Sequence, residues 1–175
     1  MKTSTFFLAV SIGLLFGCSK SSPDPKPDYY VSATIDGKAW MSNVTNSQNT
    51  LAAATLSQDL VVIAAGQEAN NTNTVIAIAF PKSIQLNKPI AINSTQYSTV
   101  AYMLSSNEGY AIDASKGVTG TLTVTRLDET AGIVEGNFSG EALHNQNGSR
   151  ISIANGQFRS IIYKTNVTPP SPGKR

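Results

Sequence analysis

Short segments in which apolar and polar residues alternate, separated by turn residues about every 8 to 12 positions, fill the chain between residues 29 and 164. A period of two places every second side chain on one face, as in a half-buried β-strand. No window of this stretch shows apolar residues at helical spacing over three turns. The pattern therefore predicts an all-β domain, an antiparallel β-sandwich or barrel-like meander of about 9 to 11 strands.

The clearest single element is a hairpin with an Asp-Gly turn at residues 36–37. Asp-Gly between alternating apolar residues favours a two-residue type I′ turn. With that loop length, Ile35 lies opposite Lys38 and Ala33 lies opposite Trp40. The face that carries these side chains is apolar apart from Lys38, so it is expected to be the core side. Trp40 is therefore predicted to be a core residue rather than a platform on which a sugar stacks.

Further strand segments follow up to residue 113. Residues 60–66 and 74–80 are continuous apolar runs, which favours central strands of a sandwich or strands buried on both faces. The polar residues 67–73 between them predict a loop. Strands are also expected at residues 50–56, at 89–92 on a sheet edge because of Pro89, and at 99–104 and 109–113 as a hairpin.

The last third of the chain has the most regular alternation. Its predicted elements are a strand at 120–127, a turn at 128–132, strands at 133–143 and 150–154, a turn at Asn155 and Gly156, and a strand at 157–163. Gly136 and Gly140 fall on the apolar face of their strand, where a bulge or close packing is expected.

An apolar run ends next to the only cysteine of the chain, Cys18. Residues 6–16 would span roughly 16 Å as a helix, about half of a bilayer core, so the run is too short to cross a membrane. Lys2 precedes the run and the small residue Gly17 follows it, which indicates a signal peptide at residues 1–17. A thiol at this position is the attachment site of a lipoprotein lipid, whose several acyl chains give stable anchoring. The alternative is an ordinary secretory signal in which Cys18 is incidental.

Residues 18–28 are polar, contain alternating prolines and lack an apolar anchor, so they are predicted to form a disordered tether. Ser19, rather than an aspartate, follows the cysteine, which is the pattern of export to the outer membrane. The β domain is expected to span residues 29–165, followed by a disordered tail at 166–175. These features predict a lipid-anchored domain at the outer membrane that faces either the periplasm or the medium.

Several motifs follow one another in a specific order. They are the lipidation site with its linker rich in Pro and Ser, an Asp-Gly-Lys-x-Trp hairpin at residues 36–40, a G-x-L-x-V-T strand at 120–125, Asp128 in a turn, Gly-Asn-Phe-Ser-Gly at 136–140 and a closing segment at 151–158. This order resembles an uncharacterised lipoprotein family of Bacteroidetes, a domain of unknown function, over most of residues 29–163. The resemblance implies the β fold and the envelope location, and it implies no reaction.

The residue inventory argues against most enzyme chemistries. With one cysteine and one histidine, His144, the chain lacks the residues of a zinc site and has no motif of a Ser-His-Asp triad. His144 lies beside a predicted hairpin turn and is expected to be solvated. Glu135 and Glu141 share a strand face but lie roughly 20 Å apart, too far for a glycosidase pair. No catalytic, cofactor or metal site is therefore predicted, although a cross-strand pair such as Asp113 with Glu141 and a calcium site built from loop oxygens stay open.

The charge balance disfavours a nucleic-acid partner. Lys and Arg total 13 and Asp and Glu total 11, and the basic residues form no run.

The favoured interpretation is a non-enzymatic binding or scaffolding module, tied to the membrane by a lipid on Cys18, with a glycan or an envelope protein as its ligand. One alternative is an inhibitor or immunity-type protein against an envelope or host hydrolase, which a protruding loop at 42–49 or 67–73 with a charged or aromatic tip would favour. The other is a hydrolase with cross-strand carboxylates. Glycan binding predicts that two or more of four tyrosines are exposed on one face: Tyr97, Tyr102, Tyr110 and Tyr163.

Overall fold

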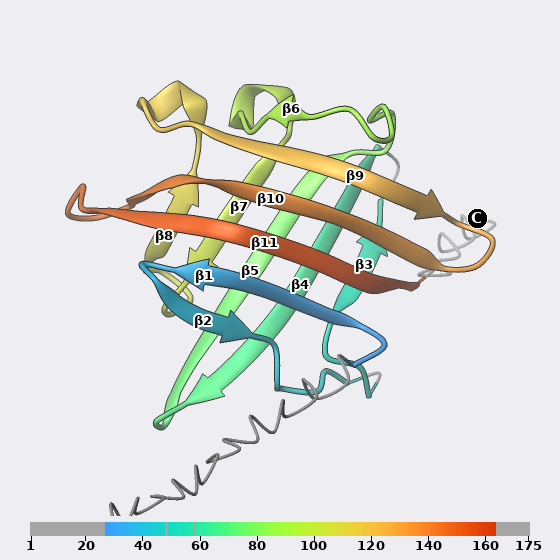
Figure 1. Ribbon diagram of the computed structural model, residues 1–175, viewed down its shortest axis with the longest axis horizontal. Coiled ribbons are helices and arrows are strands. Elements are labelled where there is room, and N and C mark those ends of the chain that lie inside the picture. Colours follow the sequence, from blue (N-terminus) through green and yellow to red (C-terminus); the bar gives the residue numbers. More distant parts are fainter. Residues whose placement is uncertain (1–26, 48, 58, 164–175) are drawn as a thin grey trace, which may run out of the picture.

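The β domain has eleven strands and two short 3-10 helices within the residues that the computed structural model describes, 27–47, 49–57 and 59–163 (Figure 1). The predicted signal peptide, Cys18 and the predicted tail at 166–175 lie outside the described residues. The elements are β1 (Tyr30–Ile35), β2 (Lys38–Met41), β3 (Ala53–Leu56), β4 (Leu60–Ala69), β5 (Thr72–Pro81), β6 (Ile90–Ala91), η1 (Ser94–Gln96), β7 (Thr99–Met103), β8 (Gly109–Ile112), η2 (Ala114–Lys116), β9 (Gly120–Asp128), β10 (Ile133–His144) and β11 (Arg150–Tyr163).

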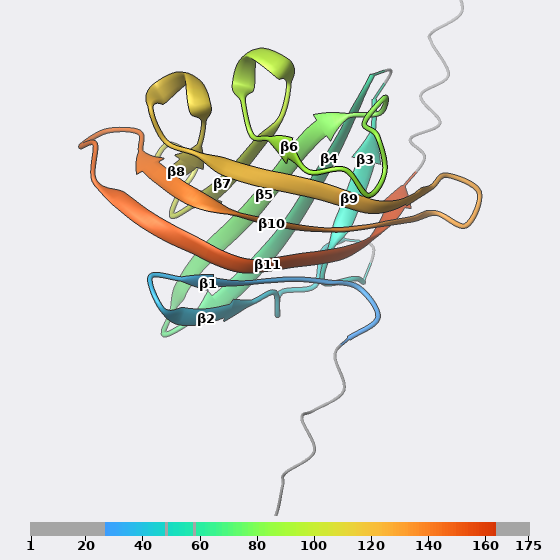
Figure 2. The ribbon, with the colours of Figure 1, turned by 45° about the horizontal axis from the view of Figure 1, so that its top comes forward.

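The strands form two layers that are joined at both edges. Strands β2, β1, β11, β10, β9 and β6 form the front layer of Figure 1, and β3, β4, β5, β7 and β8 form the rear layer. The layers cross obliquely, which Figure 2 shows from a second angle. The end of β10 pairs with β8 and the end of β11 pairs in parallel with β3, so these two long strands connect the layers. The predicted all-β sandwich or barrel-like meander is confirmed, with one parallel pairing added.

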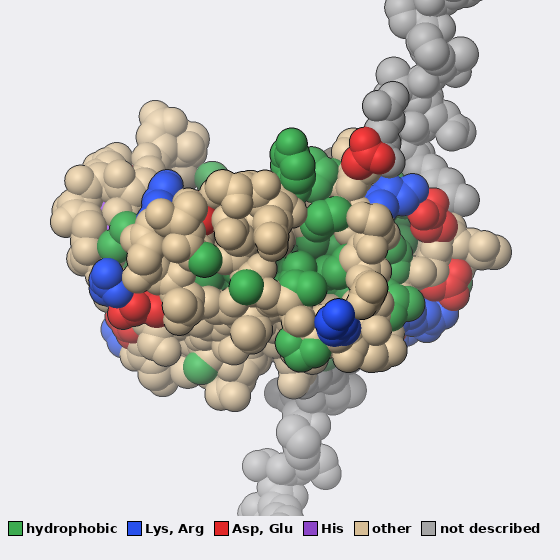
Figure 3. Space-filling model, turned by 90° about the horizontal axis from the view of Figure 1, so that it is seen from above, with side chains coloured by type: hydrophobic (Ala, Val, Ile, Leu, Met, Phe, Trp, Pro, Cys, Tyr) green, Lys and Arg blue, Asp and Glu red, His purple; other side chains and the backbone are tan. Residues whose placement is uncertain are grey.

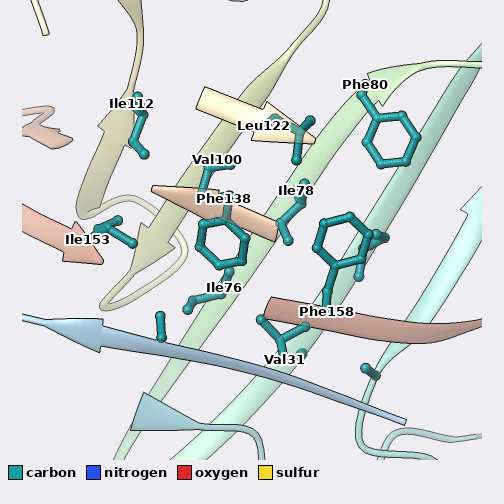
Figure 4. Close-up of a cluster of buried hydrophobic side chains, with 14 of the residues drawn as sticks. Val31, Ile76, Ile78, Phe80, Val100, Ile112, Leu122, Phe138, Ile153 and Phe158 are labelled. Carbon is teal, nitrogen blue, oxygen red and sulfur yellow. The ribbon is translucent and has the colours of Figure 1, made fainter. Parts of the chain in front are cut away.

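Inward side chains of both layers fill the space between them (Figure 4). Phe158 of the front layer lies 6.4 Å from Phe80 of the rear layer, measured between ring centroids. Full burial of one such side chain stabilises the fold by about 2 kcal/mol. Trp40 is 3% exposed, and its indole N–H donates to Thr74 Oγ1 at 2.9 Å. The prediction that Trp40 is a core residue is therefore confirmed.

The first hairpin has the predicted turn and register. Residues 36–37 have φ angles of 46° and 77°, as a type I′ turn requires. Ile35 pairs with Lys38 and Ala33 pairs with Trp40. Because the turn type and the loop length fix the register, this element follows from local sequence alone.

The apolar runs of β4 and β5 are central strands of the rear layer, but they are buried on one face only. Ile63 and Ile78 are fully buried, whereas Val62 is 41% exposed. The other outward positions carry small residues such as Ala77 and Ala79, which are partly exposed. Of the two alternatives, central strands are confirmed and burial on both faces is wrong, because periodicity cannot show whether a second layer covers a strand.

β4 and β5 continue through residues 67–73, where the polar sequence predicts a loop. Ala69 pairs with Thr72, and the turn consists of Asn70 and Asn71, with φ angles of 52° and 60°. Asparagine tolerates the left-handed region, so this pair closes a tight hairpin as Asp-Gly does. The loop prediction is wrong because these polar side chains belong to the solvated end of a hairpin.

Asn155 and Gly156 do not form a turn, because β11 runs through them as one strand. The pairing with both β1 and β10 shifts by one residue here, and Asn155 has a φ of 53°, which identifies a β-bulge. The extra residue switches the inward side of the strand, so that Ile153 before it and Phe158 after it both enter the core. The turn prediction is wrong because a left-handed Asn-Gly pair suits a bulge as well as a turn, and two neighbouring strands hold β11 straight.

The predicted close packing at the two glycines of β10 is confirmed. A Cβ on Gly136 would overlap the ring of Phe158, and one on Gly140 would lie 2.6 Å from the Cα of Gly120. These two positions let β9 and β11 approach β10 closely.

Candidate functional site

Among the described residues, Tyr97 has the most exposed large hydrophobic side chain, at 70%. It directly follows η1, and its backbone is left-handed, with φ 57° and ψ 26°. This conformation is uncommon for bulky residues and costs about 1 to 3 kcal/mol. Core packing does not explain a strained aromatic residue in solvent, so the candidate site is built around Tyr97.

Hydrogen bonds on both sides of Tyr97 fix the loop that carries it. The Tyr97 N–H donates to the carbonyl of Ser94 at 3.1 Å, and Asn93 Oδ1 accepts from the N–H of Thr95 at 3.0 Å. Ser98 is fully buried, and its Oγ donates to the carbonyl of Asn93 at 3.2 Å and accepts from the Asn93 N–H at 2.9 Å. The exposed ring therefore lies on a loop that these hydrogen bonds close.

Asp113 joins this loop to η2. Its Oδ2 accepts from the Ser94 hydroxyl at 2.8 Å, and its Oδ1 accepts from the Ser94 N–H at 3.2 Å and from the Ser115 hydroxyl at 2.8 Å. Burial acts to raise the pKa of Asp113, but hydrogen bonds from Ser115 and Ser94 together outweigh it and lower the pKa to about 2. The carboxylate is thus ionised at neutral pH and holds the two 3-10 helices together.

An open pocket of about 990 Å³ lies beside the Tyr97 ring, where β4 begins and β5 ends. It is called the Tyr97 pocket below. Its lining residues are Ser57, Asp59, Leu60, Pro81, Lys82, Ser83 and Tyr97. Figure 3 looks onto this end of the molecule and shows hydrophobic side chains gathered in a hollow, with Lys or Arg and Asp or Glu side chains at its rim.

Two polar side chains at this rim have no hydrogen bond to another described residue, the carboxylate of Asp59 and the hydroxyl of Ser83, and both residues are exposed. The ammonium of Lys82 pairs with Glu129 at 2.9 Å. Leu60 and Pro81 pair with each other at the strand ends and form an apolar wall. The pocket therefore combines an exposed aromatic face, an apolar wall and polar groups at the edge.

The other three tyrosines proposed for a glycan surface are not exposed with Tyr97. Tyr102, Tyr110 and Tyr163 are each partly buried. Tyr102 and Tyr110 stack with ring centroids 6.5 Å apart at the opposite end of the molecule. The expectation of two or more exposed tyrosines on one face is therefore not met, so a glycan surface of several tyrosine rings is wrong, and among the four tyrosines only the ring of Tyr97 is exposed enough for a sugar to stack on.

His144 is buried rather than solvated, with 4% of its surface exposed. It pairs with Tyr110 as the last residue of β10, and the Tyr110 ring packs edge-on at 4.7 Å. The imidazole Nδ1 accepts from the Gln146 N–H at 3.2 Å, and Nε2 lies 3.3 Å from Glu108 Oε1. The expectation of a solvated residue is wrong because pairing with β8 extends β10 to the turn and keeps His144 on the inward side.

The carboxylates named for a hydrolase have separate partners. Glu141 pairs with Arg150 at 2.6 Å, whereas Asp113 binds the serines of the two 3-10 loops. Asp128 and Glu135 do approach each other through Arg126, at 2.9 Å and 3.7 Å from its nitrogens. The N–H of Ala131 and then Arg126 lower the pKa of Asp128, so this carboxyl lacks the raised pKa of a general acid.

Hydrogen bonds and strand pairing hold residues of both segments that were candidates for an inhibitor loop. In the segment 42–49, Ser42 is buried and accepts from the Val31 N–H at 3.0 Å, and Asn43 Oδ1 accepts from the Glu68 N–H at 2.7 Å. The segment 67–73 is a hairpin whose tip consists of two asparagines. This tip bears no charged or aromatic side chain.

Within residues 27–47, 49–57 and 59–163, no three His, Cys, Asp or Glu side chains gather as a metal site would require. The same residues contain no helix long and apolar enough to cross a membrane. Compared with protein-family models, curated proteins and solved structures, the chain has no match.

Sequence reasoning named Tyr97 but missed every other residue of its pocket. Leu60 and Pro81 come from paired strand ends, and Asp59 and Lys82 come from the turns beyond them. No local signal identifies these residues, because only the tertiary fold brings them to the loop of Tyr97.

Proposed function

We propose that this chain is a lipid-anchored binding module of the cell envelope, and that it binds a glycan in the Tyr97 pocket. The lipid on Cys18 would hold the domain at the outer membrane through the tether at residues 18–28. The observation that carries the proposal is the Tyr97 ring, 70% exposed on a left-handed backbone beside a pocket of about 990 Å³. Strain of this kind clusters at ligand sites, where the surrounding structure maintains it.

A saccharide suits the chemistry of the pocket. The aliphatic face of a sugar ring stacks on an aromatic face, and the hydroxyls at the ring edge need acceptors and donors within reach. Tyr97 offers the aromatic face, and Asp59 and Ser83 offer polar groups without described partners. A binding site also fits better than a glycosidase, because Asp59 is the one carboxylate among the lining residues and glycoside hydrolysis uses a pair.

Native gel electrophoresis through soluble polysaccharides tests the ligand. The panel would include peptidoglycan fragments, dextran and a β-glucan, each set in the gel. The wild-type chain should be retarded by at least one of them, and Tyr97→Ala should migrate as in a blank gel. Leu86→Ala serves as the matched control, because Leu86 is also an exposed apolar residue, at 46%, and does not line the pocket. The proposal fails if no glycan retards the wild type or if Tyr97→Ala is retarded equally.

Mass spectrometry of the chain from bacterial membranes tests the anchor. The mature chain should begin at Cys18 and carry acyl chains, and Cys18→Ala should remain an unprocessed or soluble form. A mature wild-type protein with a free Cys18 thiol would contradict the anchor and leave the pocket test unaffected.

A further inference from the structure

A second pocket, of about 480 Å³, opens at the end of the molecule opposite the Tyr97 pocket. It is called the mouth pocket below. It lies where the β1–β2, β4–β5 and β7–β8 hairpins end, at the lower left of Figure 1. Leu60 and Gln67 of β4 belong to the Tyr97 pocket and the mouth pocket respectively, and the strand between them spans roughly 23 Å. The two pockets are therefore separate sites.

The inner wall of the mouth pocket is apolar and largely aromatic. Tyr102 and Tyr110 stack with an interplanar angle of 26°, and Ile35, Leu104 and Ile151 lie around them. Trp40 also lines the pocket. A cavity of a few hundred Å³ with aromatic walls is typical of small-molecule sites.

Lys38 places a positive charge over this apolar wall. It pairs with Ile35 in the hairpin and therefore points to the same face as Trp40, the face that enters the core. It is exposed and has no ion pair or hydrogen bond with any described residue. The neighbouring carboxylate, Asp36, is already engaged, because its Oδ1 accepts from the Ser152 N–H at 2.7 Å.

Two further polar groups in the pocket lack a partner among the described residues. Gln67 is partly buried on the inward side of β4, and its side-chain amide makes no described hydrogen bond. The Tyr102 hydroxyl likewise has none. Both residues line the same pocket as Lys38, so together they suit a group that accepts several hydrogen bonds and carries negative charge.

We propose that the mouth pocket binds a small amphipathic anion, a carboxylate or sulfonate on a flat apolar body. The apolar body lies against Tyr102 and Leu104, and the anionic group binds Lys38 with help from Gln67. This site is independent of the glycan site and of the lipid anchor.

The only tryptophan of the chain, Trp40, reports on this pocket. The experiment titrates the full chain, in a Cys18→Ser background that removes any attached lipid, with the fluorescent anion 8-anilinonaphthalene-1-sulfonate. Energy transfer from Trp40 to the probe should be saturable with one site per chain. Lys38→Gln should weaken binding about five- to tenfold, Lys38→Arg should restore it, and added salt should weaken it.

Lys116→Gln is the matched control, because Lys116 is also an exposed lysine and removing it changes the net charge equally. It should bind the probe as the wild type does. The neutral probe N-phenyl-1-naphthylamine should bind wild type and Lys38→Gln alike. Equal binding of the anion by Lys38→Gln and Lys116→Gln, or loss of the signal on Tyr97→Ala rather than on Lys38→Gln, would overturn the proposal.

Discussion

The two ends of the sandwich use tyrosine in opposite ways. At one end Tyr97 stands in solvent on a short loop with a left-handed backbone, held by Ser98 and Asp113. At the other end Tyr102 and Tyr110 lie on regular strands, partly buried and stacked on each other. The first arrangement costs backbone strain, and the second gains burial. Tyrosine therefore stabilises the fold at the mouth pocket, whereas Tyr97 destabilises the fold through backbone strain. A cost of this kind is expected where a side chain serves binding rather than packing.

Polar groups near the two pockets are of two kinds, those bonded within the fold and those without a described partner. Asp113 accepts hydrogen bonds from both Ser94 and Ser115 and serves the structure. Lys38 at the mouth and Asp59 at the rim of the Tyr97 pocket have no described partners. Groups without partners beside a pocket are available to a ligand, whereas the bonded ones are needed to hold the loops.

The largest expected effect is a difference in the free energy of unfolding between substitutions at Tyr102 and at Tyr97. Tyr102→Ala removes a partly buried ring that packs against the core and against Tyr110, so it should lower the free energy of unfolding by about 3 kcal/mol. Tyr97→Ala should change this free energy by less than about 1 kcal/mol. Urea unfolding followed by Trp40 fluorescence measures both, and equal losses would erase the distinction drawn between the two ends.

The second-largest expected effect is a pH dependence of the unfolding free energy, which is caused by the carboxylate of Asp113. Its pKa of about 2 in the folded chain lies below the value of about 3.9 expected for the unfolded chain. Its carboxylate therefore stabilises the fold fully above about pH 5, by on the order of 2 kcal/mol, and this contribution is lost as pH falls from about 4 to about 2.

Urea unfolding of wild type and Asp113→Asn at several pH values checks this assignment. The difference in unfolding free energy between the two proteins should be largest at pH 7 and should shrink by at least about half at pH 2. A difference that stays constant with pH would show that Asp113 does not hold the two loops as an ion.

A smaller effect, an increase in the free energy of unfolding, is expected when Tyr97 is replaced by glycine. Tyr97→Gly relieves the left-handed backbone, so it should raise the unfolding free energy by about 0.5 to 1 kcal/mol despite the loss of a side chain. Tyr97→Ala keeps a Cβ and should show no such gain. A clear loss of stability in Tyr97→Gly would mean that the ring supports the loop.

The smallest stability effect is expected at Lys38. Because Lys38 is exposed and has no described partner, Lys38→Gln should shift the unfolding free energy by less than about 0.5 kcal/mol. Thermal unfolding alongside Lys116→Gln measures the shift. A large loss would assign Lys38 a structural role at the hairpin.

Local sequence rules predict the elements whose structure is set by residues close to them in the sequence. The first hairpin, the burial of Trp40 and the close packing at Gly136 follow from turn chemistry and alternation. These rules fail where a distant strand decides the outcome. Asn155 forms a bulge because β1 and β10 flank it, and His144 is buried because Tyr110 of β8 pairs with it.

The candidate sites depend on tertiary structure to a greater degree. Tyr97 adopts its left-handed backbone in a loop that Asp113 holds through Ser94 and that Ser98 holds through Asn93, and the loop sequence contains no glycine to signal it. Lys38 was visible in the sequence as the polar exception on an apolar hairpin face. Its place in a pocket depends on β4, β7 and β8, which contribute the other lining residues.

If Tyr97 is held in a strained conformation to bind a ligand, the Tyr97→Gly protein should lose affinity without losing stability. The measurement is the dissociation constant of this folded variant for whichever polysaccharide retards the wild type. Affinity should fall by at least about tenfold in a protein no less stable than the wild type. An unchanged dissociation constant would show that the ring of Tyr97 does not bind the ligand.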